Sequence, residues 1–151
     1  MNNENSEKLD SPSVKIIKDF GVPAEKVFDA WIDPKWISRW MFGPDVRDEE
    51  IIKLEASPKK NGTFSYVVRR EGELINHLGT YLEVNRPGRL VFTWGVEGVS
   101  EEESTVTIEI VSTENGCRLT LIHQLDPEWS EYTERTKEGW SFMMDKLKDL
   151  L

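Results

Sequence analysis

The sequence is poor in the residues that form disulfides and bind metals. It has a single cysteine, Cys117, among 151 residues, so no disulfide can form within the chain. Its two histidines, His77 and His123, do not stand at the Cys/His spacing of a zinc site. We therefore expect no metal centre and no cofactor, and we interpret Cys117 as a structural residue.

Long apolar runs are absent as well. No run of about 18 apolar residues occurs, and the first thirteen residues, MNNENSEKLDSPS, contain no apolar core like that of a signal peptide. We therefore expect a cytoplasmic protein without membrane insertion. Residues 1–12 are polar and lack periodicity, which predicts a disordered N-terminal tail followed by one domain over residues 13–151.

Basic residues are outnumbered by acidic ones. The chain has 19 lysines and arginines against 28 aspartates and glutamates, and its formal net charge is −9 at pH 7. A negative field repels the phosphates of nucleic acids and anionic lipids. Nucleic acid is therefore not an expected partner, and we interpret the acidic run Glu101–Glu103 as a solvated loop.

Aromatic residues, in contrast, are concentrated near the start of the chain. Three of the six tryptophans, Trp31, Trp36 and Trp40, lie within one stretch of ten residues. Apolar residues recur there at helical spacing, which predicts two short helices over residues 23–31 and 34–41. Each begins with a proline, and an aspartate precedes the second proline as a cap.

Strand signals fill most of the remaining sequence. Segments rich in branched and aromatic residues alternate with turns that contain Gly, Pro or Asn. Short turns make consecutive strands antiparallel neighbours. The predicted strands cover residues 14–20, 49–57, 62–70, 74–85, 88–96, 103–113 and 116–125.

The C-terminal segment has a helical pattern. From about Ser130 to Leu151, apolar residues recur every three or four positions, which predicts one long amphipathic helix. Only the apolar face of the sheet is broad enough to cover this helix. The sequence therefore predicts an α+β fold, in which a seven-stranded antiparallel sheet curls around the C-terminal helix and the two short helices close one end of the groove.

Several of these segments resemble one known superfamily. The segment VPAEKVFDAWIDPKWISRWMFGP matches its two-helix opening, and HLGTYLEVNRPGRLVFTW matches a central pair of strands. LTLIHQ and EGWSFMMDKLKDLL match its last strand and terminal helix. Over residues 13–151 the chain thus resembles the SRPBCC superfamily, whose fold is called START-like or helix-grip. Within it, the chain is most similar to homologues of the activator of heat-shock-protein-90 ATPase.

The resemblance implies that a ligand or an active site lies between the sheet and the terminal helix. Large apolar residues and a few polar ones are candidates for lining a cavity there, and the same residues are also expected to fill an ordinary core. The sequence leaves both interpretations open. The candidates are Trp31, Trp40, Phe64, Tyr66, His77, Tyr81, Phe92, Trp94, His123, Trp140, Met143 and Met144.

The two histidines are the candidates for proton transfer. The alternative, which we favour, is a partly exposed histidine near the end of a strand with its hydrogen bonds satisfied. Whether His77 and Tyr81 face the same side is also open, because a bulge can reverse the alternation of a strand. No serine lies in a nucleophile-elbow motif, so the sequence indicates no catalytic constellation.

The resemblance implies three alternative functions. The first is binding of a small apolar or aromatic ligand in the cavity. The second is a cyclase-like or hydrolase-like enzyme that uses the same cavity, with a tyrosine or histidine as proton donor. The third is an interaction module that contacts a chaperone. Trp129 has two interpretations, as a residue of a homodimer contact or as a cap of the terminal helix.

Overall fold

The computed structural model describes residues 12–100 and 104–151. The predicted tail therefore lies outside the described residues except for Pro12, whose carbonyl oxygen accepts a hydrogen bond from Leu125 N at 2.9 Å. The acidic run Glu101–Glu103 also lies outside them, and so does the expectation that it is a solvated loop.

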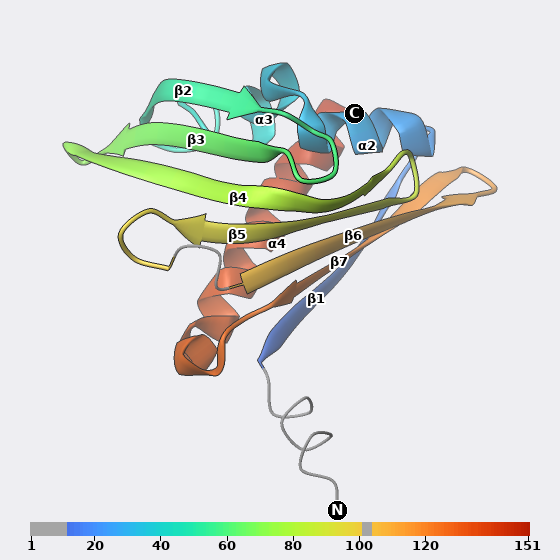
Figure 1. Ribbon diagram of the computed structural model, residues 1–151. Helices are drawn as coiled ribbons and strands as arrows, with labels where there is room; N and C mark the ends of the chain where they lie inside the picture. The colour runs from blue at the N-terminus through green and yellow to red at the C-terminus, as the bar shows by residue number, and fades with distance from the viewer. Residues whose placement is uncertain (1–11, 101–103) are drawn as a thin grey trace, which may run out of the picture.

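A seven-stranded antiparallel sheet forms the body of the fold (Figure 1). Its strand order is β1-β7-β6-β5-β4-β3-β2, so six consecutive strands form a meander and β1 pairs with the last of them. The predicted fold is confirmed, and each strand end lies within one residue of its predicted position. The strands are β1 (Ser13–Phe20), β2 (Glu50–Ala56), β3 (Thr63–Arg70), β4 (Glu73–Asn85), β5 (Arg89–Val96), β6 (Ser104–Thr113) and β7 (Gly116–Gln124).

Two short helices stand between β1 and β2. They are α2 (Ala24–Ile32) and α3 (Pro34–Trp40). The Asp33 side chain caps α3 by accepting a hydrogen bond from Lys35 N at 2.9 Å, as the aspartate–proline pair predicts. In Figure 1 both helices lie at the same end of the sheet. They bury their apolar faces there, including the whole side chain of Trp40.

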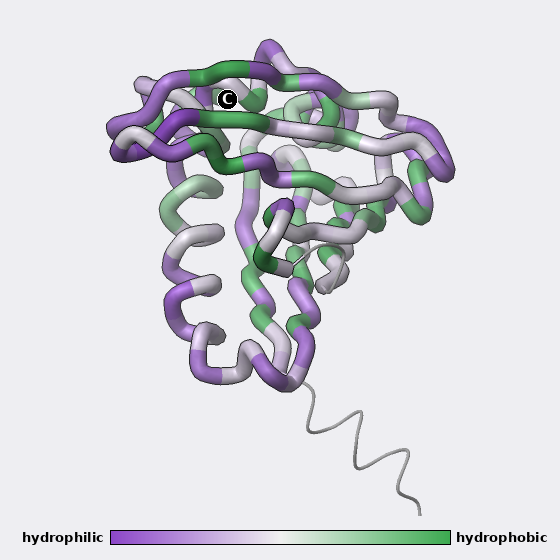
Figure 2. Tube along the Cα trace, turned by 60° about the vertical axis from the view of Figure 1, so that its left-hand side comes forward, coloured by the Kyte–Doolittle hydropathy of each residue, from purple (hydrophilic) through white to green (hydrophobic). Residues whose placement is uncertain are grey.

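The C-terminal helix runs lengthwise against the inner face of the bent sheet. Figure 2 shows one part of the sheet running down beside this helix and the rest crossing above it, so the sheet bends around the helix. The helix, α4 (Thr133–Leu150), buries Trp140, Met143, Met144 and Leu147 against the sheet. No helix in residues 12–100 and 104–151 is long and apolar enough to cross a membrane.

The start of this helix differs from the prediction. A 3-10 helix, η1 (Pro127–Tyr132), precedes α4, so the α-helix itself begins three residues after Ser130. The reason is a cap that lies earlier in the chain. Asp126 accepts a hydrogen bond from Glu128 N at 3.0 Å, and this contact starts a tighter turn before the amphipathic pattern begins.

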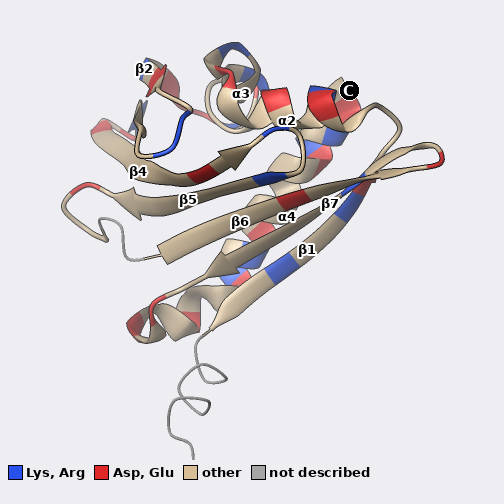
Figure 3. Ribbon diagram, turned by 45° about the vertical axis from the view of Figure 1, so that its right-hand side comes forward, with Lys and Arg blue, Asp and Glu red and all other residues tan. Residues whose placement is uncertain are grey.

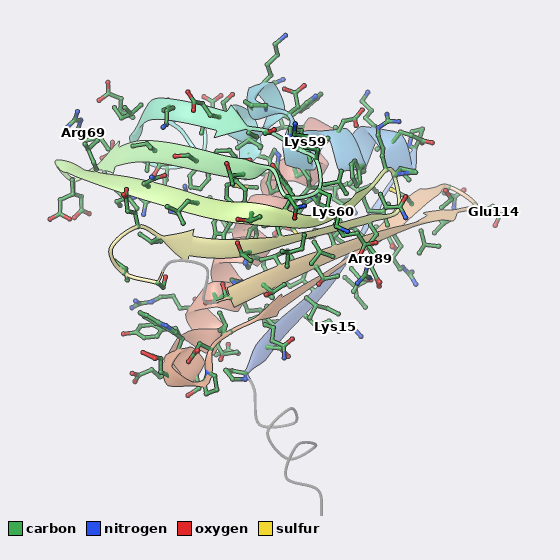
Figure 4. All side chains as sticks on the ribbon, in the orientation of Figure 1. Lys15, Lys59, Lys60, Arg69, Arg89 and Glu114 are labelled. Atoms are coloured by element: carbon green, nitrogen blue, oxygen red, sulfur yellow. The ribbon has the colours of Figure 1, made fainter. Side chains whose placement is uncertain are left out.

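Charged side chains on neighbouring strands pair on the outer side of the sheet. Arg89 pairs with Glu83 at 3.0 Å and with Glu109, and Figure 3 shows the matching red, blue and red segments on β4, β5 and β6. Arg69 and Glu114, which Figure 4 labels, lie near the turns at opposite tips of the sheet. The inner face is therefore left mainly to apolar and neutral polar residues.

Glu49 carries a charge but is buried, and it joins the two-helix segment to the sheet. Its carboxylate accepts hydrogen bonds from Gly43 N at 2.8 Å, from Arg47 at 3.0 Å and from Arg70 at 2.7 and 2.9 Å. Burial raises the pKa of Glu49, but the Gly43 amide and the two guanidinium groups more than offset this effect. The pKa therefore lies below its usual value, and the carboxylate stays charged at neutral pH.

Candidate functional site

Aromatic side chains fill the middle of the groove. The ring of Trp31 lies 4.7 Å from that of Trp40 and 5.7 Å from that of Trp140, between centroids. The space left there is a cavity of about 10 Å³, enough for at most one water molecule. Its walls come from residues on α2, the end of α3 and three strands: Trp31, Met41, Phe64, Tyr66, Tyr81, Phe92 and Trp94.

A larger cavity has a volume of about 270 Å³. Figure 1 shows that the elements which line it lie at the end of the groove opposite α2 and α3. Its walls come from the end of β5 and the turn after it, the start of β6, the end of β7, η1 and the first half of α4. We call this the outer cavity and the 10 Å³ space the inner cavity. The outer cavity is lined by Trp94, Val96, Ser100, Ser104, His123, Leu125, Trp129, Tyr132, Thr136, Gly139, Trp140 and Met143.

Two further hollows are more polar and lie outside the groove. One, of about 510 Å³, lies beside the β2–β3 turn and Pro34, and its lining is half polar, from serine, threonine and glutamate side chains, and half apolar. The other, of about 400 Å³, lies at the β6–β7 turn between Arg118 and Lys148. Neither offers the mainly apolar wall that a small-molecule site usually has.

The structure divides the twelve predicted site residues among three environments. Trp94, His123, Trp140 and Met143 line the outer cavity. Trp40, His77 and Met144 line neither cavity and pack in the core. The other predicted residues, together with Trp94, line the inner cavity: Trp31, Phe64, Tyr66, Tyr81 and Phe92.

Eight residues of the outer cavity were not among the predicted site residues. A signal existed for those on the C-terminal segment, because Tyr132 and Thr136 stand four positions apart on the same helical stripe as Trp140. For residues in the turn after β5, such as Ser100, no local pattern could have revealed the position. Trp129, for which two roles were open, lies with its ring 5.3 Å from that of Tyr132 at the wall of this cavity.

A chain of hydrogen bonds at the wall of the outer cavity connects α4 to three strands. Trp140 Nε1 lies 2.9 Å from His123 Nδ1, and His123 Nε2 lies 2.9 Å from Ser104 Oγ, which is 2.6 Å from Trp94 O. An indole nitrogen only donates and a carbonyl oxygen only accepts. Trp140 therefore donates to Nδ1, the neutral imidazole carries its proton on Nε2 and donates to Ser104, and Ser104 donates to the Trp94 carbonyl.

The direction of these hydrogen bonds bears on catalysis. A histidine that activates a serine must accept the hydroxyl proton on the nitrogen that faces the serine. In this protein that nitrogen already carries a proton. Burial lowers the pKa of His123 to about 4, so the ring stays neutral at neutral pH. The arrangement positions Ser104 and does not activate it as a nucleophile.

Both histidines are buried, which corrects the expectation of partly exposed residues at strand ends. His123 is 3% exposed and His77 is 8% exposed. His77 Nδ1 lies 3.3 Å from Tyr66 O, and its ring centroid lies 4.5 Å from that of Phe42. Burial lowers the pKa of His77 to about 4 as well. Each histidine is therefore neutral and held by buried partners, and the two do not meet in one site.

The facing of residues in β4 is now defined. His77 and Tyr81 are four positions apart and both are buried. The irregularity in the β4–β5 register falls between Tyr81 and Glu83, so the alternation from 77 to 81 is undisturbed. Both side chains therefore face the inside of the groove.

The single cysteine has the properties of a structural residue. Cys117 is buried in β7, and burial raises the pKa of its thiol, which favours the unreactive protonated form. Within the part of the chain that the structure describes, no cluster of three or more His, Cys, Asp or Glu side chains could hold a metal ion.

Several solved structures share this fold. Protein CV1439 from Chromobacterium violaceum is 20% identical, with a TM-score of 0.80 and coverage of 92% of this chain and 96% of that chain. Protein NE0264 from Nitrosomonas europaea is 23% identical, with a TM-score of 0.78 and coverage of 93% and 94%. SA2116 from Staphylococcus aureus, a protein of unknown function, is 19% identical, with a TM-score of 0.74 and coverage of 89% of each chain. No curated protein matches the sequence significantly.

A family model gives the classification. The model of the activator of Hsp90 ATPase homolog 1-like proteins matches residues 21–151. This range contains both short helices, every strand after β1, and the C-terminal helix with its Gly-Trp motif. The resemblance inferred from the sequence motifs is thus confirmed. The chain belongs to the family of activator of Hsp90 ATPase homolog 1-like proteins.

Proposed function

We propose that this protein binds a small, neutral, apolar or aromatic molecule in the outer cavity. The observation that carries the proposal is the lining. The indole rings of Trp94 and Trp140, 5.4 Å apart between centroids, stand beside Leu125 and Met143. Small-molecule sites are typically lined in this way, by apolar and aromatic side chains with a few polar groups. The direction of the hydrogen bonds at Ser104 supports binding over a serine-based hydrolysis.

The volume of the outer cavity limits the size of the ligand. Pockets for drug-sized molecules usually measure about 300–1,000 Å³, and an apolar cavity of about 150 Å³ can hold benzene. A cavity of about 270 Å³ therefore fits a molecule of one or two rings, or an aliphatic molecule of similar bulk.

The lining also limits the charge of the ligand. None of the lining residues in the described part of the chain carries a formal charge, because His123 is neutral. The hydroxyl groups of the wall come from Ser100, Ser104, Tyr132 and Thr136. An ionised ligand would lose its hydration without gaining a partner of opposite charge. A neutral ligand with few polar atoms is therefore favoured.

Titration of the tryptophan fluorescence with neutral one-ring probes tests the proposal. Three of the six tryptophans, Trp94, Trp129 and Trp140, line the outer cavity, so acetophenone and ethylbenzene should change the emission in a saturable way. Isothermal titration calorimetry gives the same affinities independently. At Gly139, an added Cβ meets no atom within 4 Å, so Gly139→Phe can fill the cavity without displacing the backbone. We expect this variant to lower both affinities at least tenfold.

Glu138→Phe is the matched control for the filling variant. It introduces the same side chain at the neighbouring exposed position of α4, which does not line the cavity. This variant should bind both probes like the wild-type protein. Absence of saturable binding to the wild type, or equal binding by wild type and Gly139→Phe, would contradict the proposed function.

A further inference from the structure

Two buried polar atoms make no hydrogen bond within the described residues: Tyr81 Oη and Trp31 Nε1. Tyr81 is 2% exposed and Trp31 is 3% exposed. The Tyr66 hydroxyl is near enough to influence the pKa of Tyr81, but the pair does not have the geometry of a hydrogen bond. An unpaired buried donor destabilises a fold, and native structures keep very few of them.

Both unpaired atoms belong to residues that line the inner cavity. The other walls are aromatic rings and Met41, and none of them carries a charge. An indole N–H only donates, and a phenol hydroxyl can donate. Burial raises the pKa of Tyr81, so its hydroxyl keeps its proton. The residues around the inner cavity thus include two unpaired donors for an acceptor atom and no cation for an anion.

The linings of the inner cavity and the outer cavity share one residue, Trp94. Its ring centroid lies 5.4 Å from that of Trp140 in the outer cavity and 5.9 Å from that of Phe64 in the inner cavity. It is only half-buried, whereas Trp140 and Phe64 are buried. Trp94 is therefore the side chain whose rotation we expect to join the two spaces.

We infer that Tyr81 and Trp31 form the polar end of the ligand site, and that the ligand carries a neutral hydrogen-bond acceptor of the carbonyl or ether class at one end of an apolar body. This inference rests on the proposed function and adds the polar group of the ligand to it. The body occupies the outer cavity. The acceptor oxygen passes Trp94 and receives hydrogen bonds from both donors. A carboxylate or phosphate does not suit the inner cavity, since no lining side chain is positively charged.

Two probes of matched shape test the inference. Acetophenone and ethylbenzene share a phenyl ring and a two-carbon substituent, but only the ketone has an acceptor oxygen. After correction for their partition between water and an alkane, the wild-type protein should bind acetophenone at least fivefold more tightly. Tyr81→Phe removes the hydroxyl and keeps the ring, so it should abolish most of this preference without weakening ethylbenzene binding. The infrared carbonyl band of ¹³C-labelled bound acetophenone should lie at lower frequency in the wild type than in Tyr81→Phe.

The role of Trp94 has its own measurement. Trp94→Phe places a smaller ring between the outer cavity and the inner cavity. The association rate of acetophenone should therefore increase at least threefold. Trp36→Phe is the matched control, because Trp36 lines neither cavity and its replacement should leave this rate unchanged.

The outcomes separate the inference from the proposed function. Equal corrected affinities of the wild type for the two probes would overturn the inference while the proposed function stands. A carbonyl band that Tyr81→Phe leaves in place would do the same. If neither probe binds to the wild type, both the inference and the proposed function fail.

Discussion

Trp140 Nε1 donates a hydrogen bond to His123 Nδ1 across 2.9 Å, and this contact fastens the C-terminal helix to β7 at the wall of the outer cavity. Both residues are 3% exposed, so neither partner can turn to water if the other is removed. The same contact fixes the imidazole in one tautomer. The imidazole therefore donates a hydrogen bond to Ser104 and does not act as a base towards it.

Trp140→Phe should therefore affect both stability and the state of the imidazole. The variant leaves Nδ1 of His123 unpaired and removes part of a buried ring, which should lower the free energy of unfolding by about 2–4 kcal/mol. Urea denaturation at neutral pH measures this loss. In ¹⁵N NMR spectra, His123 of the wild type should show a proton on Nε2 only, whereas the variant should show both tautomers. A proton on Nδ1 of His123 in the wild type would contradict the assigned direction of the hydrogen bonds.

Stability should decrease as the pH falls from about 6.5 to about 4. Burial lowers the pKa of His77 and of His123 to about 4 in the folded protein, and the unfolded value is near 6.5. Between these pH values the unfolded chain binds more protons than the folded one, so lower pH favours unfolding. The stabilisation is fully present above about pH 6.5, and each histidine accounts for on the order of 2–3 kcal/mol of the decrease.

Urea denaturation across this pH range checks the effect. His123→Gln keeps a side-chain donor and removes one titrating group, so the dependence of stability on pH should be about half as steep. The same steepness in the wild type, His123→Gln and His77→Gln would refute the assignment of this pH dependence to the two histidines.

Glu49 acts at lower pH. Its pKa in the folded protein lies below the usual value, so its stabilisation is present above the usual pKa and is lost as the pH falls through the folded pKa.

Glu49→Gln should destabilise the protein strongly. The substitution preserves the shape of the side chain but removes the charge that Arg47 and Arg70 share. Breaking a buried charged pair on one side typically costs about 3–5 kcal/mol, and the partial exposure of both arginines places the expected loss near 2–3 kcal/mol. Glu55→Gln is the matched control. The Glu55 carboxylate lies 3.8 Å from Lys53 Nζ on the surface, so its change should be within about 0.5 kcal/mol of zero.

Gly139→Ala should stabilise the protein by about 0.5–1 kcal/mol. The position is inside α4, where glycine lowers helix stability, and an added Cβ meets no atom within 4 Å. Gly116→Ala gives the opposite expectation, because Gly116 has φ +154° and its Cβ would lie 2.0 Å from Phe20 O. Thermal unfolding should thus show an increased midpoint for the first variant and a decreased one for the second. A decrease for Gly139→Ala would show that the glycine is needed for packing.

Local sequence patterns predict the elements of this fold well, because the structure obeys them almost everywhere. The apolar residues Val106, Ile108 and Ile110 alternate in the sequence and are all buried on one face of β6. The start of η1 shows how two local signals can compete. The pair Asp126–Pro127 is the same start signal as Asp33–Pro34. The amphipathic stripe begins later, however, and the predicted helix start followed the stripe and not the cap.

The site was harder to predict because long-range contacts decide it. The environment of His123 depends on Ser104, 19 residues before it, and on Trp140, 17 residues after it. The alternation in β7 puts His123 on the same buried face as Leu119 and Leu121, but it does not indicate the partners of the imidazole. Likewise, the sequence supplies the aromatic residues but not their packing. Only the positions of the rings show that they fill the middle of the groove and leave the larger space at one end.

The pairing of β1 with β7 has a consequence for folding during synthesis. Val14 lies opposite His123 in the register, so the first strand of the sheet cannot form its hydrogen bonds until the last strand has been synthesised. A nascent chain on the ribosome can form its hairpins in order, but β1 stays without its neighbour until more than a hundred residues have followed it. In a chain from which β1 has been removed, β7 becomes an uncovered border on which a strand from another molecule can add.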